Sequence, residues 1–111
     1  MIEDRMFPML ENLLTLTSKR HQILAGNVAN MDTPGYRARD ISFAAELDGS
    51  LDISSKVIEV ETKDKPTGNN VDLDRELTEI TKNGLQYVTL VQYLNQKIKT
   101  LRSAISEGGK F

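Results

Sequence analysis

Residues 73–105 read LDRELTEITKNGLQYVTLVQYLNQKIKTLRSAI, and this stretch decides the fold. Its apolar residues recur at alternating steps of four and three over more than four heptads. Such a pattern predicts a long helix with one apolar edge. We call this edge the seam, and it consists of Leu73, Leu77, Ile80, Tyr87, Val91, Leu94, Ile98, Leu101 and Ile105. Gly84 falls in the same row and is its one position without a large side chain.

The predicted length of this helix can be compared with the diameter of a compact chain. Asp72 can cap its start, and Gly108 is typical of its end. A helix over residues 72–106 is about 52 Å long, whereas a compact chain of 111 residues is about 34 Å across. Part of the seam therefore has no partner within one molecule. This favours assembly over the alternative, an ordinary core helix in a small bundle.

A second amphipathic helix is expected over residues 4–30, where apolar side chains recur at helical spacing. Pro8 suits a first turn, so we expect the regular helix to begin near it. Asp32-Thr33-Pro34-Gly35 then interrupts the helical pattern. Pro followed by Gly predicts a type II turn in which Gly35 has a positive φ.

The middle of the chain has no single pattern. We expect an extended piece over residues 36–43 and a short helical turn within 42–51. Alternating apolar and acidic residues predict a short strand over 57–62. Residues 62–70 are polar and contain Pro and Gly, which is typical of a mobile loop.

The overall composition excludes several function classes. The net charge of −2 favours neither nucleic acid nor an anionic membrane as a partner. No cysteine is present, His21 is the single histidine, and no catalytic, cofactor-binding or metal-binding motif is found. No apolar run predicts direct membrane insertion, and the N-terminus does not resemble a cleaved signal peptide. We therefore expect a protein that is not an enzyme.

Two amides stand out on the N-terminal helix. Asn27 and Asn30 lie one turn apart on the face that carries Leu16 and Ile23. Polar residues on an apolar stripe can fix the register between helices. A frayed helix end with Asn as a breaker explains the same residues, and the sequence leaves both interpretations open.

Two separated motifs resemble a known family. Residues 29–36, ANMDTPGY, are similar to the ANxxTPGY signature of the flagellar rod and hook axial proteins. Residues 68–76, GNNVDLDRE, resemble a second signature, found in a proximal rod member of that family. The resemblance covers about 1–47 and 66–108, and the stretch between the signatures is shorter than is usual in the family.

The resemblance implies a structural subunit of the bacterial flagellar proximal rod that assembles through its terminal helices. It implies export by the flagellar type III apparatus and a periplasmic place in the basal body. The implied partners are copies of the chain itself, FlgC-like rod subunits, a FliE-like adaptor, the MS ring and the export gate. The implied assembly motif comprises Asn27, Asn30, Thr33, Pro34, Gly35, Tyr36, Asn70, Val71, Asp72 and Asp74.

Alternatives are another axial protein of the FlgC or FlgF type and, in a different class, a cytosolic coiled-coil adaptor or export chaperone. The expected fold is mainly α, with two long terminal helices as a coiled-coil-like pair around a short irregular or β segment. One domain is expected, divided into a helix and turn (1–35), a variable middle (36–70) and the heptad helix (71–111).

Overall fold

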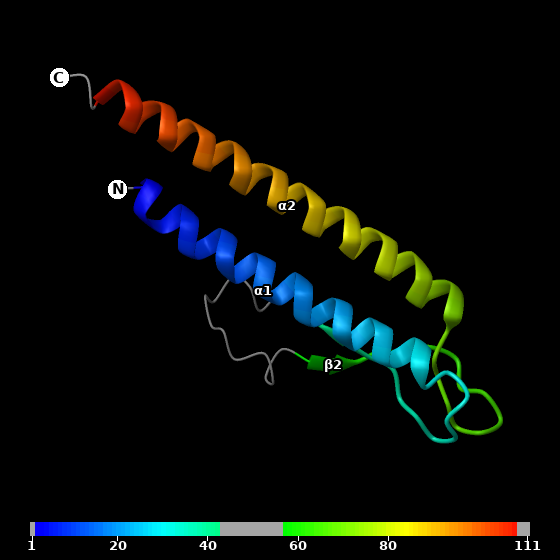
Figure 1. Ribbon diagram of the computed structural model, residues 1–111. Coiled ribbons are helices and arrows are strands. Elements are labelled where there is room, and N and C mark those ends of the chain that lie inside the picture. Colours follow the sequence, from blue (N-terminus) through cyan, green and yellow to red (C-terminus); the bar gives the residue numbers. More distant parts are fainter. Residues whose placement is uncertain (1, 43–56, 109–111) are drawn as a thin grey trace.

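The computed structural model describes residues 2–42 and 57–108 of the chain. Helix α1 (Ile2–Ala29) and helix α2 (Leu73–Gly108) run antiparallel, and strands β1 (Arg39–Ile41) and β2 (Val57–Glu59) lie between them in sequence. Figure 1 shows the two helices side by side, with the small sheet beside the C-terminal half of α1. The predicted fold class is confirmed. The helical turn expected within 42–51 lies outside the described residues, apart from Ser42.

Helix α1 is longer than its sequence predicts at the N-terminal end. It begins at Ile2, so Pro8 lies inside the helix instead of near its start. Proline lacks one backbone donor and crowds the preceding turn. That cost falls close to the end of the helix, and Pro8 is exposed.

The turn after α1 has the predicted geometry. Gly35 has a φ of 74°, and the Tyr36 backbone N–H donates to the Thr33 carbonyl at 3.2 Å. A side chain at Gly35 would be strained at this φ. The turn reverses the chain and directs residues 36–42 back along α1.

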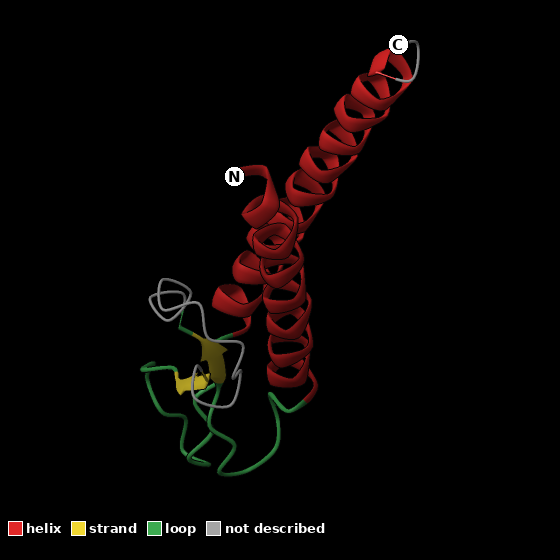
Figure 2. Ribbon diagram, turned by 90° about the vertical axis from the view of Figure 1, so that its left-hand side faces the viewer, coloured by secondary structure: helices red, strands yellow, loops and turns green. Residues whose placement is uncertain are grey.

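The sheet is small and antiparallel, with Arg39 opposite Glu59 and Ile41 opposite Val57. The strand predicted over 57–62 is thus shorter in the structure. One more bond continues the pairing, because the Val60 N–H donates to the Ala38 carbonyl at 2.9 Å. Figure 2 shows this sheet next to the looped end of the helix pair.

Helix α2 begins at the predicted cap. The Asp72 carboxylate accepts hydrogen bonds from the backbone N–H groups of Asp74 and Arg75, at 3.1 and 3.3 Å. The helix has 36 residues, which corresponds to about 54 Å. The molecule measures 71 × 24 × 15 Å, so it is elongated, as the heptad pattern predicts.

Helix α2 is longer than α1, and its C-terminal end extends beyond the N-terminus of α1, as Figures 1 and 2 show. The Tyr93 hydroxyl lies 3.8 Å from the Met6 sulfur, so these residues are level with each other. Since both helices advance equally per residue, Ile2 is level with about residue 97. We call residues 99–108 the overhang.

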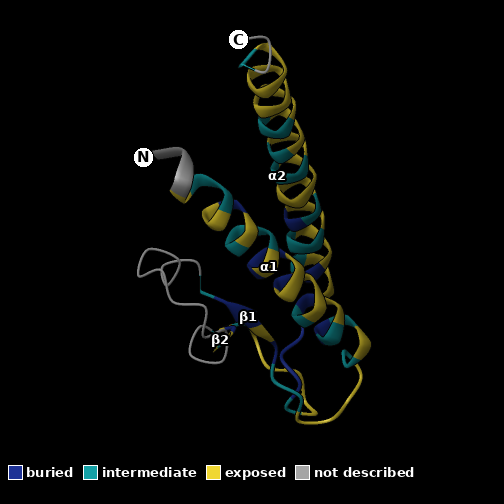
Figure 3. Ribbon diagram, turned by 60° about the vertical axis from the view of Figure 1, so that its left-hand side comes forward, coloured by how far each residue is buried: buried dark blue, intermediate teal, exposed yellow. Residues whose placement is uncertain are grey.

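Burial is concentrated at the looped end of the molecule. Leu10, Leu16 and Leu24 are the buried leucines of α1, while Figure 3 shows the C-terminal half of α2 mostly exposed or half-buried. A separate apolar cluster of Ala38, Val60 and Val71 packs under Met31 and Tyr36. Neither described helix is long and apolar enough to cross a membrane.

Candidate assembly site

The two sequence signatures meet in space, although more than 30 residues separate them. The Gly35 N–H donates to the Thr67 carbonyl at 3.0 Å. Gly68 also has a positive φ, 82°, and a Cβ added there would lie 3.6 Å from the Gly35 Cα. The two glycine turns therefore pack directly against each other.

Asn69 ties the second signature to the end of α1. Its Nδ2 donates to the carbonyls of Asn30 and Thr33, at 2.9 and 2.8 Å. Its Oδ1 accepts the Val71 N–H at 2.8 Å, and the side chain is buried. Asn30 itself stays at the helix end, where its Nδ2 donates to the Gly26 carbonyl.

Asn70 acts as a bridge within the sheet region. Its Oδ1 accepts the Ala38 N–H at 2.6 Å, and its Nδ2 donates to the Val60 carbonyl at 2.7 Å. Its backbone N–H donates to the Tyr36 carbonyl, and its carbonyl accepts the Thr62 hydroxyl. The segment expected to be a mobile loop is thus held at its C-terminal end by buried amides.

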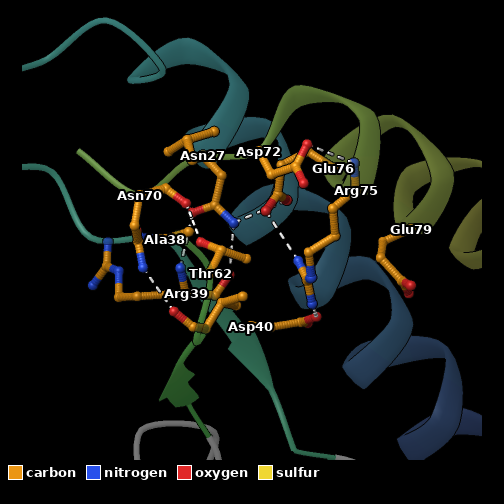
Figure 4. Close-up of polar contacts among 12 residues, drawn as sticks. Asn27, Ala38, Arg39, Asp40, Thr62, Asn70, Asp72, Arg75, Glu76 and Glu79 are labelled. Atoms are coloured by element: carbon orange, nitrogen blue, oxygen red, sulfur yellow. Dashed lines mark hydrogen bonds and ion pairs between the residues drawn. The ribbon is translucent and has the colours of Figure 1, made fainter. Parts of the chain in front are cut away.

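Asn27 joins α1 to both the sheet and α2, as Figure 4 shows. Its Nδ2 donates to the Arg39 carbonyl at 2.7 Å and to Glu76 Oε2 at 3.0 Å. Its Oδ1 accepts the Arg39 N–H at 3.0 Å and the Tyr36 hydroxyl at 3.2 Å. All the hydrogen-bonding capacity of this fully buried amide is therefore used.

A buried group of charges lies beside Asn27. Arg20 forms a bidentate pair with Asp40, at 2.8 and 3.0 Å, and donates to Glu79 Oε2 at 2.7 Å. Arg75 spans Asp40 and Glu76, at 2.9 and 3.0 Å. Two guanidinium groups and three carboxylates thus connect α1, β1 and the first two turns of α2. We call these five residues the charge cluster.

Within the charge cluster, the contacts of Asp40, Arg20 and Arg75 favour their ionised forms. Burial acts to raise the pKa of Asp40, but hydrogen bonds from Arg20, Arg75 and the Ile41 N–H outweigh it, so this pKa is lowered. Burial likewise acts to lower the pKa of Arg20 and Arg75, and their carboxylate partners raise it overall. Removing one partner from a largely buried ionic group is costly, because it leaves a charge without compensation.

The region that contains the two glycine turns, the buried amides and the charge cluster is called the corner from here on. The remaining residues of the predicted assembly motif also lie there. Val71 is buried in the apolar cluster, and Asp72 caps α2. Pro34 and Asp74 are exposed, so the structure places them on the surface. The motif is therefore brought together at one end of the molecule, where its polar groups bond partly to each other and largely to neighbouring residues such as Arg39, Asn69 and Glu76.

The seam lies on the flank of the contact between the helices. Glu76 and Asn83, one heptad apart, are the buried residues of α2. Among the seam residues that are only half-buried are Ile80, Val91, Leu94 and Ile98. Those with 40–73% exposed surface are Leu73, Leu77, Tyr87, Leu101 and Ile105. No seam residue is fully covered by the described part of the chain.

The sequence did not point to the charge cluster or to Asn83. Charged residues on a helix usually indicate a solvated face, and Asp40 lies in an irregular stretch. A usable signal existed in Arg20 and Asn27, which interrupt the apolar stripe of α1 one heptad apart. Two such polar residues on an apolar stripe predict polar partners on the helix that packs against it.

Comparison with known proteins identifies the family. A family model described as a flagella basal body rod protein matches residues 12–37. The flagellar basal body rod protein FlgB of Bacillus subtilis is 33% identical to the chain, covering 91% of it and 92% of the relative. This chain belongs to the FlgB family.

Other FlgB proteins agree. FlgB of Escherichia coli is 34% identical over 88% of this chain and 91% of its own length. FlgB of Aeromonas hydrophila is 32% identical, over 92% and 93%. These matches disfavour a FlgC or FlgF type. The alignments span 120–125 residues against a chain of 111, so these FlgB relatives carry additional residues.

Proposed function

We propose that the chain is a structural subunit of the flagellar basal-body rod, and that its terminal helices assemble it with other basal-body components. The seam carries this proposal. Five of its large side chains retain 40–73% of their surface, on a helix that extends beyond its internal partner. Large apolar side chains in a continuous row favour association.

The energetics support assembly through the exposed half of α2. Full burial of a Leu or Ile side chain contributes about 1.5–3 kcal/mol relative to exposure. Leu101 and Ile105, which are 40% and 73% exposed, leave much of this unused. Neighbouring helices can supply the missing cover and offset the entropy of ordering the overhang.

The looped end has a different role in this proposal. The amides and the charge cluster are satisfied internally, so they hold the angle and register of α1, α2 and the sheet. The corner then presents α2 to its neighbours in one orientation. We infer that the assembly motif acts chiefly by building this corner, while the seam makes the contacts between molecules.

We propose the finer assignments on the basis of the similarity to FlgB proteins. We place the subunit in the proximal, periplasmic part of the rod, with its own copies and FlgC-like subunits as neighbours. A FliE-like adaptor, the MS ring and the export gate would adjoin it. Export by the flagellar type III route suits a chain whose α2 is thinly packed, because such a segment unfolds at low cost.

The test is incorporation into basal bodies. A tagged chain, expressed in the bacterium that it comes from, should appear in purified basal bodies by mass spectrometry. Ile105→Asp should reduce its incorporation at least about tenfold, since a charge then occupies the seam. The matched control is Leu85→Asp, which alters a side chain that is 65% exposed and lies outside the seam.

The alternative function, a cytosolic adaptor or export chaperone, predicts the opposite distribution of the chain between basal bodies and the soluble fraction. Such a protein would stay in the soluble fraction and would be absent from washed basal bodies. Equal incorporation of Ile105→Asp and the unmodified chain would contradict the role of the seam.

A further inference from the structure

A groove of about 350 Å³ lies between the middle of α1 and the middle of α2. The surface that lines it is mostly apolar, although polar residues contribute to it; the lining includes Thr17, His21, Asn83, Gly84, Tyr87 and Val88. The groove thus opens at the one position of the heptad row that lacks a large side chain.

Gly84 has no evident purpose within the monomer. A Cβ added there would meet nothing within 4 Å, so no internal neighbour requires glycine. Glycine in a helix interior is unfavourable compared with alanine, because it loses more backbone freedom on folding. A residue that weakens the helix without helping internal packing points to a partner that needs the space.

Asn83 supplies a second observation on the groove wall. Its Nδ2 donates to the Thr17 carbonyl at 2.9 Å. Its Oδ1 is buried and accepts no hydrogen bond from the described residues. Buried acceptors are normally satisfied, so the polar contact between the helices is imperfect at this wall of the groove, although the side chain of an apolar occupant would not supply the missing donor.

The overhang carries exposed apolar side chains at heptad spacing from Gly84. Its seam residues Leu101 and Ile105 are exposed, and it extends beyond the cover of α1 (Figure 1). Ile105 follows Gly84 by 21 residues, which is a whole number of heptads. A parallel copy displaced by about 32 Å along α2 therefore brings Ile105 level with Gly84 on the same edge.

We propose that the groove beside Gly84 receives the overhang of a second copy of this chain, with Ile105 seated against Gly84. The proposal deepens the assembly function and rests on it. The contact is heterologous: one molecule contributes the groove and its neighbour the overhang. With this displacement the neighbour's own α1 does not clash with the groove. The N-terminal end of α1 is level with about residue 97, and the overhang lies beyond it.

Site-directed cross-linking tests the pairing, because the sequence has no cysteine and the engineered thiols are then the only ones in this chain. The variant Gly84→Cys/Ile105→Cys, treated with a short thiol-reactive cross-linker in purified basal bodies, should give multimers. The control Leu85→Cys/Ile105→Cys should give at least about tenfold less product, since residue 85 lies about 100° around the helix from residue 84. Gly84→Cys alone should give little dimer.

A filled groove gives an independent readout. Gly84→Leu should keep the thermal midpoint of the purified chain unchanged or raise it, yet lower incorporation into basal bodies. Gly84→Ala should incorporate better than Gly84→Leu, because the smaller side chain leaves most of the groove open.

The outcomes separate the two proposals. A chain that enters basal bodies but gives no cross-link between positions 84 and 105, or as much with the control, would overturn the groove pairing and leave the rod function standing. Normal incorporation of Gly84→Leu would also overturn it. Exclusion of the unmodified chain from basal bodies would instead overturn the rod function, and the pairing with it.

Discussion

The side-chain amide of Asn27 donates to Glu76 Oε2 at 3.0 Å, and neither residue is accessible to solvent. This bond links the last turns of α1 to the first turn of α2 across 49 positions of sequence. It lies where the two family signatures meet, so the orientation of the helix pair depends on polar groups as much as on apolar packing.

Replacing Asn27 should therefore lower the stability of the fold. Asn27→Ala removes the partner of Glu76 Oε2, of the Arg39 backbone N–H and carbonyl, and of the Tyr36 hydroxyl, while Glu76 Oε1 keeps its bond from Arg75. We expect the free energy of unfolding to fall by about 3 kcal/mol, measured by urea denaturation followed by circular dichroism. Asn95→Ala on the exposed side of α2 is the control and should change it by less than about 0.5 kcal/mol. Equal midpoints for the two variants would contradict the linking role.

The charge cluster predicts a dependence on pH. The folded pKa of Asp40 is below its ordinary value, so the unfolded chain binds the proton first as the pH falls. The stabilisation by Asp40 is fully present above the unfolded pKa of about 3.9. It is lost as the pH drops through the folded value.

Asp40→Asn should isolate this effect. At pH 7 the variant leaves Arg20 and Arg75 without their shared carboxylate, and we expect a loss of about 3 kcal/mol or more. Between pH 5 and pH 3 the difference from the unmodified chain should narrow, as urea melts at each pH would show. A constant difference over that range would show that Asp40 does not titrate as described.

Two glycines should respond to substitution with opposite signs. Gly35→Val forces a branched side chain into a φ of 74° and should destabilise the chain by about 1–3 kcal/mol. Gly84→Ala fills open space in a helix and should stabilise it by about 0.5–1 kcal/mol. Thermal melts of both variants check this, and a stabilising Gly35→Val would refute the turn geometry.

Amide hydrogen exchange should divide α2 into two zones. Residues 76–83 contain its buried side chains, whereas the overhang has no helix beside it. In the dilute monomer we expect exchange in residues 99–108 to be at least about a hundredfold faster than in 76–83. Uniform protection along α2 would mean that the overhang is already ordered without neighbours.

Much of the architecture could be predicted because it depends on local repeats. The heptad row gave α2 and its exposed edge, and Thr33-Pro34-Gly35 gave the turn. The bonds of Arg20 to Asp40 and to Glu79 span 20 and 59 positions, and no periodic pattern encodes such distances. The loop over 62–70 reads as mobile because its order comes from Asn69 and Asn70, whose partners lie elsewhere in the chain.

Because α1 and α2 differ in length, the two ends of the molecule are different. The looped end is closed by its own hydrogen bonds, and at the other end α2 projects beyond α1 and exposes Leu101 and Ile105. In the pairing proposed above, every added copy recreates the site for the next. The described part of the fold contains no element that would end such a series.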